Sequence, residues 1–184
     1  RRVNQKFADA VLEEIEGRKA LVWIQDFHLS LLPAMLKAKR PDILVAHFWH
    51  IPWPNPEVFR IYPWIHEMLE GMLGNDLIGF HIKLHCENFM NTVDQTLETR
   101  IDRERSVIFH HGGVATKVLP FPISVDDRMI SKDAEMDYSE NEVVSDVHGS
   151  LPDRVRHIAV GVDRIDYTKG IPERLMAIDR FLTK

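Results

Sequence analysis

Apolar residues recur every three or four positions in several stretches of the chain. This spacing places them on one face of a helix, where they can pack against a core. Gly17 follows the first stretch, and glycine commonly ends a helix because it adopts the left-handed conformation of the closing turn. We therefore predict helices at 3–15, 31–36, 65–73 and 89–101, and a final helix that begins at Pro172.

Short runs that are almost wholly apolar lie between these stretches. Such runs are typical of strands in a sheet that is covered on both faces. We predict strands at 20–24, 43–49, 76–80, 107–109, 114–119 and 157–162. Because strands alternate with helices, we expect an α/β fold built on an open, doubly wound parallel sheet. Ligands of such sheets bind beyond the carboxyl ends of the strands.

The charge and composition of the chain narrow the range of partners. Its 184 residues include 23 Lys and Arg against 28 Asp and Glu, which gives a net charge of −5. Binding to nucleic acid or to an anionic membrane needs an excess of cations, so we expect neither partner. The apolar runs are far shorter than the ~18 residues of a transmembrane helix, and the first residues lack a signal peptide's apolar stretch. Cys86 is the only cysteine, so an internal disulfide framework is excluded. Together these features lead us to expect a soluble, cytoplasmic protein.

The composition changes between Asp126 and Asp153. This stretch holds nine acidic residues and two basic ones, with almost no apolar periodicity. We therefore expect a solvated connector or a surface helix there. The chain also begins without methionine and ends within a helical pattern, so we expect it to be a fragment of a longer enzyme.

Two cations lie in the loop at 161–170, between the last predicted strand and the final helix. Arg164 and Lys169 are five positions apart around a turn, so both could reach one anion. A guanidinium offers two parallel donors to phosphate oxygens, an ammonium adds a point charge, and the following helix N-terminus adds partial positive charge. Alternatively, both are surface cations paired with Asp163 and Asp166, and the residues alone favour this second interpretation.

Polar residues also follow two other predicted strands. His50 comes after the strand at 43–49 and directly before a proline-rich loop at 51–56. It either hydrogen-bonds a polar ligand or has a purely structural role. Asp26 follows the strand at 20–24, where it either contacts a ligand or caps the next helix.

His81 and His85 have the spacing of two metal ligands on one helix face, with Cys86 beside them. A metal site would need further ligands. Because no convincing carboxylate or third histidine follows at short spacing, we predict no metal site.

Five motifs occur in order along the chain: VWIQDFHL at 22–29, HIPWP at 50–54, LIGFH at 77–81, PFPISVD at 120–126 and GVDRIDYTKGIPER at 161–174. Each is weak alone, but the ordered set is specific. Together they resemble the trehalose-6-phosphate synthase family of retaining glycosyltransferases, whose GT-B architecture pairs two Rossmann-like domains across a cleft. The similarity extends from Val22 to Leu182.

The resemblance implies a division of the chain. Residues 1–125 would be the later part of the N-terminal acceptor domain, 126–154 an acidic connecting region, and 155–184 the start of the C-terminal nucleotide-sugar domain. The family transfers glucose from UDP-glucose to glucose 6-phosphate with retention, forming trehalose 6-phosphate and UDP, without a cofactor or a required metal. The expected partners are thus a nucleotide sugar and a sugar phosphate, and the full-length protein could form a homo-oligomer or carry a fused phosphatase domain.

The resemblance also gives roles to four residues, all expected to be catalytic. Arg164 and Lys169 match the basic pair on the donor diphosphate, His50 matches the donor-sugar histidine, and Asp26 matches the acceptor-binding aspartate. The presence of both cations favours a glucosyltransferase over a catalytically silent regulatory domain of the same fold. We expect the isolated fragment to be inactive, because the family's loops for the acceptor phosphate and for the nucleotide ribose are absent from it.

Three residues depart from the family pattern. Gln25 stands where the family usually has His, Phe27 where it usually has Tyr, and Trp53 where Phe is common. Because Gln25 and Phe27 lie beside the expected sugar site, a related enzyme that makes glucosylglycerol phosphate stays an alternative.

Overall fold

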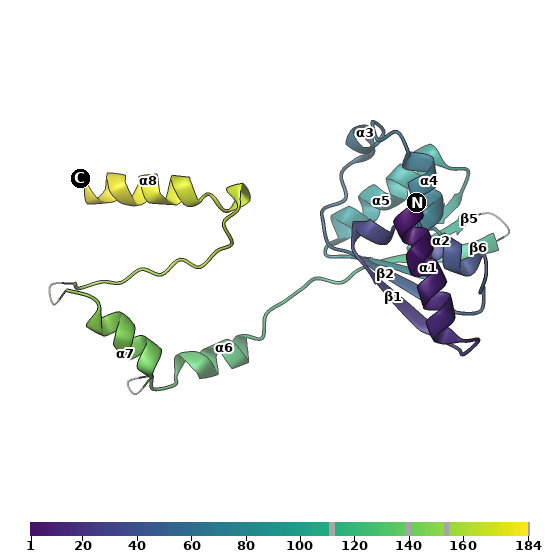
Figure 1. Cartoon of the computed structure of the whole chain (residues 1–184). Coiled ribbons are helices and arrows are strands. Elements are labelled where there is room, and N and C mark those ends of the chain that lie inside the picture. Colours follow the sequence, from purple (N-terminus) through teal and green to yellow (C-terminus); the bar gives the residue numbers. More distant parts are fainter. Residues whose placement is uncertain (111–112, 139–140, 153–154, 184) are drawn as a thin grey trace. The chain divides into compact units, whose positions relative to one another are not determined.

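The computed structural model describes residues 1–110, 113–138, 141–152 and 155–183. The chain consists of two units, Arg1–Val125 and Asp126–Lys184. The first unit holds a sheet and the helices that pack on it, and the described part of the second consists of helices and irregular segments (Figure 1). The boundary between the two units, at Val125 and Asp126, coincides with the predicted start of the acidic connecting region. The functional role of each unit stays a prediction.

The described strands of the first unit form one sheet in the order β1-β2-β3-β6-β5-β4. Neighbours within the set β1, β2, β3 and β6 are parallel. The predicted α/β fold is confirmed, with one correction: β5 is antiparallel to both β4 and β6. A short turn joins β4 to β5, whereas parallel neighbours need a crossover of a dozen or more residues. The strands are β1 (Leu21–Gln25), β2 (Leu44–Trp49), β3 (Leu77–Phe80), β4 (Arg100–Asp102), β5 (Val107–His110) and β6 (Val114–Pro120).

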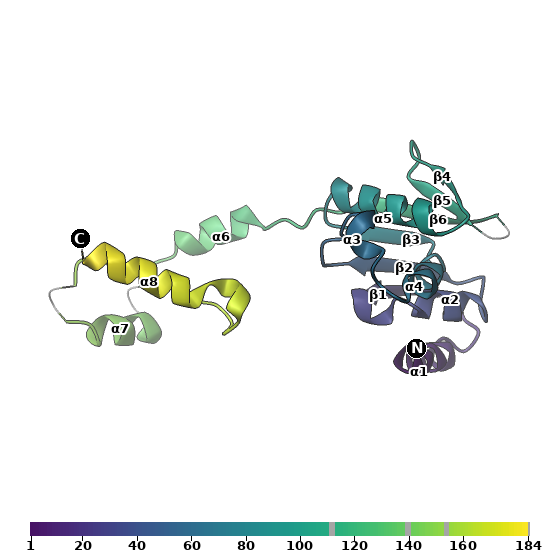
Figure 2. The same ribbon diagram turned by 90° about the horizontal axis from the view of Figure 1, so that it is seen from above.

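Helices cover one face of this sheet (Figures 1 and 2). They are α1 (Arg2–Ile15), α2 (Leu32–Lys37), α3 (Pro56–Phe59), α4 (Ile65–Met72) and α5 (Lys83–Thr96), with a short 3-10 turn, η1 (Phe27–Leu29). The helix predicted at 89–101 begins earlier and ends at Thr96, because the backbone of Leu97 is extended. Ile101 lies in β4 instead and packs against the same core, which explains why it continued the apolar pattern.

Two clusters of buried side chains lie between the helices and the sheet. The smaller joins α1 and α2 to the first two strands and consists of Ala8, Ile15, Ile24, Leu32, Leu36, Ile43 and Val45. The larger contains residues of α4, α5 and the central strands, with an aromatic group made by Trp49, Trp53, Phe80 and Phe89. Both clusters bury the faces that the apolar periodicity predicted.

Trp53 belongs to this larger core, although it comes from the proline-rich loop. Its side chain is 1% exposed, and its indole Nε1–H donates to Thr92 Oγ1 over 3.1 Å. Its ring stacks on Phe59 at 4.5 Å between centroids and meets Phe89 edge-on at 4.9 Å. The departure from the family's common Phe is therefore a change in packing.

We expect Trp53→Ala to destabilise the chain by about 3–5 kcal/mol, because it leaves a large cavity in a packed core. Trp53→Phe should cost less, about 1–2 kcal/mol, since it keeps most of the ring contacts and removes the hydrogen bond to Thr92. Urea unfolding followed by circular dichroism measures both values. Equal losses for the two variants would contradict the assignment of Trp53 to the core.

The opposite face of the sheet is also apolar. Leu21, Trp23 and Leu44 point there and are 65%, 67% and 58% exposed. The almost continuous apolar runs thus reflect two apolar faces, of which the described helices of this unit cover one.

The described residues of the second unit include α6 (Asp127–Ala134), α7 (Glu142–Gly149), the 3-10 turn η3 (Tyr167–Lys169) and α8 (Ile171–Leu182). The Asp126 carboxylate accepts the Met129 N–H at the start of α6, and the Asn141 side chain similarly caps α7. The predicted acidic region, 126–154, therefore holds two exposed helices, and its residues 139–140 and 153–154 are outside the described part. Pro172 lies in the first turn of α8, as predicted.

The strand predicted at 157–162 does not form. These residues are exposed and have no regular secondary structure. A strand takes its backbone hydrogen bonds from a neighbouring strand. Among the described residues of this unit no second strand is present to supply them, so the apolar pattern alone was not sufficient.

Candidate functional site

Asp26 and His50 meet at the carboxyl ends of neighbouring parallel strands. Asp26 directly follows β1 and His50 directly follows β2. The backbone N–H of His50 donates to Asp26 Oδ1 over 3.3 Å. Asp26 directly precedes η1, but in the described part of the chain its carboxylate accepts no hydrogen bond from the N–H groups of that turn. The helix-cap interpretation is therefore wrong.

The His50 side chain is held by the strand beside it. Its Nε2–H donates to the side-chain Oε1 of Gln25 over 2.6 Å. Its ring also makes edge-to-face contacts with two other rings. The distance between centroids is 4.8 Å to Phe48 and 5.7 Å to His81. Since Nε2 donates to Gln25, a neutral His50 leaves Nδ1 as an acceptor for a ligand hydroxyl.

His81 is not on a helix, which corrects the premise of the metal hypothesis. It lies two residues before α5, whereas His85 is inside the helix. The His81 ring packs edge-on against Phe48 at 5.0 Å, at the same end of the sheet as His50. In the part of the chain that the structure describes, no three His, Cys, Asp or Glu side chains are grouped so as to hold a metal ion.

A pocket of about 580 Å³ on the exposed face of the sheet reaches Gln25 and His50. Its walls include the rings of Phe48 and Phe121, which close over Gly79. A Cβ at Gly79 would lie 2.9 Å from Phe121 and 3.0 Å from Phe48, so only glycine fits between the two rings without displacing one of them. The two polar side chains at the rim therefore border an apolar, aromatic hollow.

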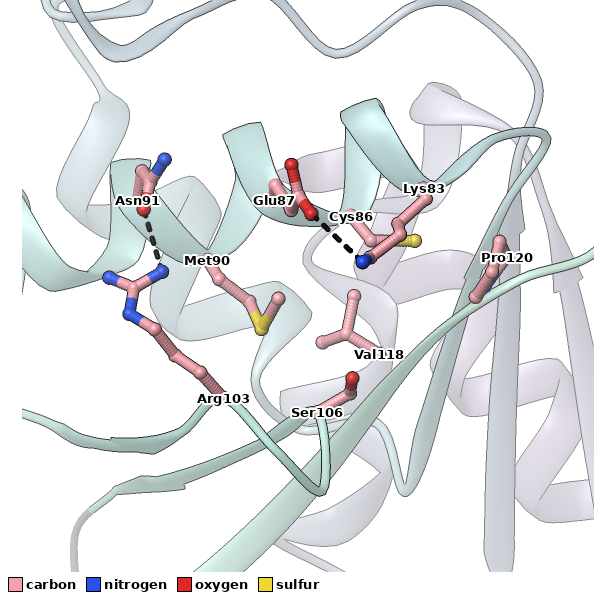
Figure 3. Close-up of a pocket in the computed structure, with 9 residues that line it drawn as sticks. All are labelled: Lys83, Cys86, Glu87, Met90, Asn91, Arg103, Ser106, Val118 and Pro120. Carbon is pink, nitrogen blue, oxygen red and sulfur yellow. Dashed lines mark hydrogen bonds and ion pairs between the residues drawn. The ribbon is translucent and has the colours of Figure 1, made fainter.

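A second pocket, of about 410 Å³, lies between α5, the turn that joins β4 to β5, and β6 (Figure 3). Lys83 pairs with Glu87 one turn further along α5, and Arg103 donates to the side chain of Asn91 on the same helix. Both cations that line this pocket, Lys83 and Arg103, thus already have partners on α5. None of the four candidate residues lines it, so it is not part of the site that the motifs predict.

The basic loop of the second unit has a defined local structure. Asp166 Oδ1 accepts the backbone N–H of Thr168 over 2.9 Å and the Thr168 hydroxyl over 2.8 Å, which fixes η3. Gly170 follows with φ 59°, a left-handed conformation that favours glycine, and turns the chain into α8. Lys169 is therefore the last residue of η3, and Gly170 alone separates it from the first residue of α8.

The two carboxylates of this loop have other partners than its two candidate cations. Asp163 pairs with Arg174 of α8, and that hydrogen bond is the main reason why the pKa of Asp163 is lowered. The backbone and side-chain hydrogen bonds from Thr168 lower the pKa of Asp166 in the same way. Among the described residues of the second unit, neither Arg164 nor Lys169 forms an ion pair, although the charge of Lys169 also lowers the pKa of Asp163 and of Asp166 to a smaller extent. The role of the two cations stays a prediction.

Two residues near Asp26 and His50 have contacts that the sequence analysis did not predict. Gln25 appeared there only as a departure from the family pattern, yet it is the hydrogen-bond partner of the His50 ring. His47 was not singled out, although its Nε2 hydrogen-bonds the backbone oxygen of Asp26. The signal that could have found His47 is a polar residue at a core-facing position of an apolar strand.

No helix in the described ranges has the length and apolar character that crossing a membrane requires.

Comparisons with known proteins agree with the fold. The sequence pattern of the family described as glycosyltransferase family 20 matches residues 1–184. The trehalose-6-phosphate synthase of Mycobacterium tuberculosis is 37% identical over 188 residues, an alignment that covers 99% of this chain. It covers only 37% of that relative, so the chain spans little more than a third of its length.

Solved structures give the same result. The UDP-forming α,α-trehalose-phosphate synthase of Burkholderia xenovorans is similar with a TM-score of 0.80 and 29% identity, over 99% of this chain and 39% of that one. A structure described as trehalose-6-phosphate from E. coli bound with UDP-2-fluoro glucose is similar with a TM-score of 0.75 and 26% identity, over 100% of this chain and 39% of that one.

Proposed function

The chain belongs to glycosyltransferase family 20, and we propose that it is part of a retaining glucosyltransferase. The whole protein would transfer glucose from UDP-glucose to glucose 6-phosphate, forming trehalose 6-phosphate and UDP. The relatives named above are trehalose-6-phosphate synthases, and one related structure contains a UDP-sugar. Because the chain spans about a third of their length, the activity is proposed for the whole protein.

The observation that carries this proposal is the meeting of Asp26 and His50. They belong to two different motifs and lie 24 residues apart in the sequence, and a hydrogen bond joins them at the end of the sheet where ligands of α/β folds bind. A carboxylate accepts two hydrogen bonds from sugar hydroxyls, and His50 offers an acceptor beside it. This pairing suits a sugar better than a phosphate, which a carboxylate would repel.

Arg164 and Lys169 supply the complementary chemistry. Breaking the bond between glucose and UDP places negative charge on the β-phosphate oxygen, and two fixed cations stabilise that charge as it develops. The departing phosphate can then take the proton of the acceptor hydroxyl on the same face of the sugar. Such a mechanism needs no pair of carboxylates, in contrast to the retaining glycosidases.

The acceptor is tested by comparing two sugar or polyol phosphates. With the whole protein and UDP-glucose, UDP release should be faster with glucose 6-phosphate than with glycerol 3-phosphate. Coupled detection of UDP measures both rates. A preference for glycerol 3-phosphate would assign the protein to the glucosylglycerol-phosphate alternative.

We further propose that no metal or other cofactor is required, since Arg164, Lys169 and the N-terminal end of α8 supply positive charge for the diphosphate. Activity of the whole protein should survive extensive treatment with EDTA. Loss of activity that Mg²⁺ or Zn²⁺ restores would contradict this.

Three further properties of the whole protein stay predictions. They are its location in the cytoplasm, the formation of a homo-oligomer and the presence of a fused phosphatase domain.

A further inference from the structure

The backbone of Asp26 has an unusual conformation. Its φ is 61° and its ψ is −179°, a combination that almost only glycine adopts. A non-glycine residue keeps such angles only where its surroundings hold it in place. Asp26 is also the residue whose carboxylate the proposed function assigns to the acceptor sugar.

Residues of β2 and its end hold Asp26 through three hydrogen bonds. The Asp26 N–H donates to the backbone oxygen of Phe48 over 2.8 Å. The backbone N–H of His50 donates to Asp26 Oδ1. The third bond joins the ring Nε2 of His47 to the backbone oxygen of Asp26 over 2.8 Å, and it is the only one of the three that a side chain of β2 makes.

The protonation of His47 follows from these contacts. A carbonyl oxygen carries no proton, so Nε2 must be the donor in this bond. His47 is 1% exposed, and its Nδ1 has no hydrogen-bond partner in the described part of the chain. Burial lowers the pKa of His47, because a charged imidazole would lose its hydration there. The ring is therefore neutral, with its single proton on Nε2.

We propose that His47 is a positioning residue, whose buried Nε2–H fixes the strained backbone of Asp26 and so aims the Asp26 carboxylate at the acceptor. This rests on the proposed function, in which Asp26 binds the sugar. His47 itself touches no substrate. Its ring lies on the core-facing side of β2, beneath the loop that carries Asp26, and acts only through the carbonyl oxygen.

Two variants of the whole protein separate positioning from packing. His47→Phe keeps an aromatic ring but has no donor, whereas His47→Gln is neutral and places an amide N–H near the position of Nε2. Trp49→Phe is the matched control, because Trp49 is a buried ring on the same strand that makes none of the three bonds to Asp26.

For His47→Phe we expect kcat/KM for glucose 6-phosphate to fall ~10-fold or more, the scale of one lost hydrogen bond that leaves a partly buried acceptor without its donor. Affinity for UDP, measured by calorimetry, should change less than about twofold, because UDP lacks the sugar. His47→Gln should recover most of the loss, and Trp49→Phe should retain kcat/KM within about threefold. In hydrogen exchange, the segment 25–29 should exchange faster in His47→Phe than in wild type and in His47→Gln.

Unchanged kcat/KM and unchanged exchange in His47→Phe would overturn the proposal. Equal losses in the Phe and Gln variants, with equal falls in melting temperature, would also overturn it and leave His47 a packing residue. If the wild-type protein transfers no glucose, the proposed function fails. The exchange at 25–29 still shows whether His47 holds Asp26, because that measurement does not depend on activity.

Discussion

Arg164→Ala or Lys169→Ala in the whole protein should lower kcat at least ~100-fold, the scale of losing one partner of a charge that develops in the transition state. Both side chains are exposed, and no ion pair within the described residues of the second unit engages them, so their loss removes no structural contact of that kind. Arg164→Lys should not restore the rate, because an ammonium cannot offer the two parallel donors of a guanidinium. Steady-state kinetics with saturating UDP-glucose measures these effects.

Lys132→Ala is the matched control for these variants. Lys132 is an exposed cation of α6 in the same unit, outside the basic loop, and its removal changes the net charge by the same amount. We expect the control to keep the wild-type rate. Near wild-type rates for Arg164→Ala and Lys169→Ala as well would return both residues to the surface-cation interpretation.

Asp26→Asn and His50→Ala should strongly reduce kcat/KM while leaving the affinity for UDP almost unchanged. Asn has nearly the size and shape of Asp and its Oδ1 can still accept the His50 N–H, so the substitution places no new steric demand on the strained backbone. The charge-assisted hydrogen bonds to the sugar are weakened, each of them worth ~1.5–3 kcal/mol, or roughly 10- to 100-fold in kcat/KM. UDP carries no sugar and reports only on the nucleotide and phosphate contacts.

Calorimetric titration with UDP beside steady-state kinetics separates the two effects. Asp9→Asn, on the exposed face of α1, is the control for loss of one carboxylate charge in the first unit and should leave both values unchanged. If UDP binding collapses together with catalysis, Asp26 and His50 are structural residues, and their assignment to the sugar is wrong.

Most of the first unit was predictable from the sequence, because its elements obey local patterns. The helical stripe ending before Gly17 became α1, and the apolar runs became the parallel strands β1, β2, β3 and β6. The predicted strand at 157–162 failed for a non-local reason, since a strand needs a neighbour that apolar periodicity cannot reveal. Ile101 shows the same limit, because its side chain joins the core from a strand although it continues a helical pattern.

The contact between Asp26 and His50 could be expected from the sequence, but the hydrogen bonds that support it could not, and the roles of the site residues stay predictions. Motif order placed Asp26 and His50 at the ends of successive strands, and strand pairing brings them into contact. The hydrogen bonds of Gln25 and His47 depend on the register of β1 against β2 and on the direction of each side chain. No pattern within a single strand contains that information, which is why His47 emerged only from the structure.

The most direct test of the central claim is the stereochemistry of the product that the whole protein makes from UDP-[13C]glucose and glucose 6-phosphate. Nuclear magnetic resonance identifies the linkage and the anomeric configuration, and the UDP released is counted beside it. The account predicts one α,α-linked disaccharide phosphate for each UDP. Free glucose in place of a disaccharide, or an inverted linkage at the transferred glucose, would contradict it.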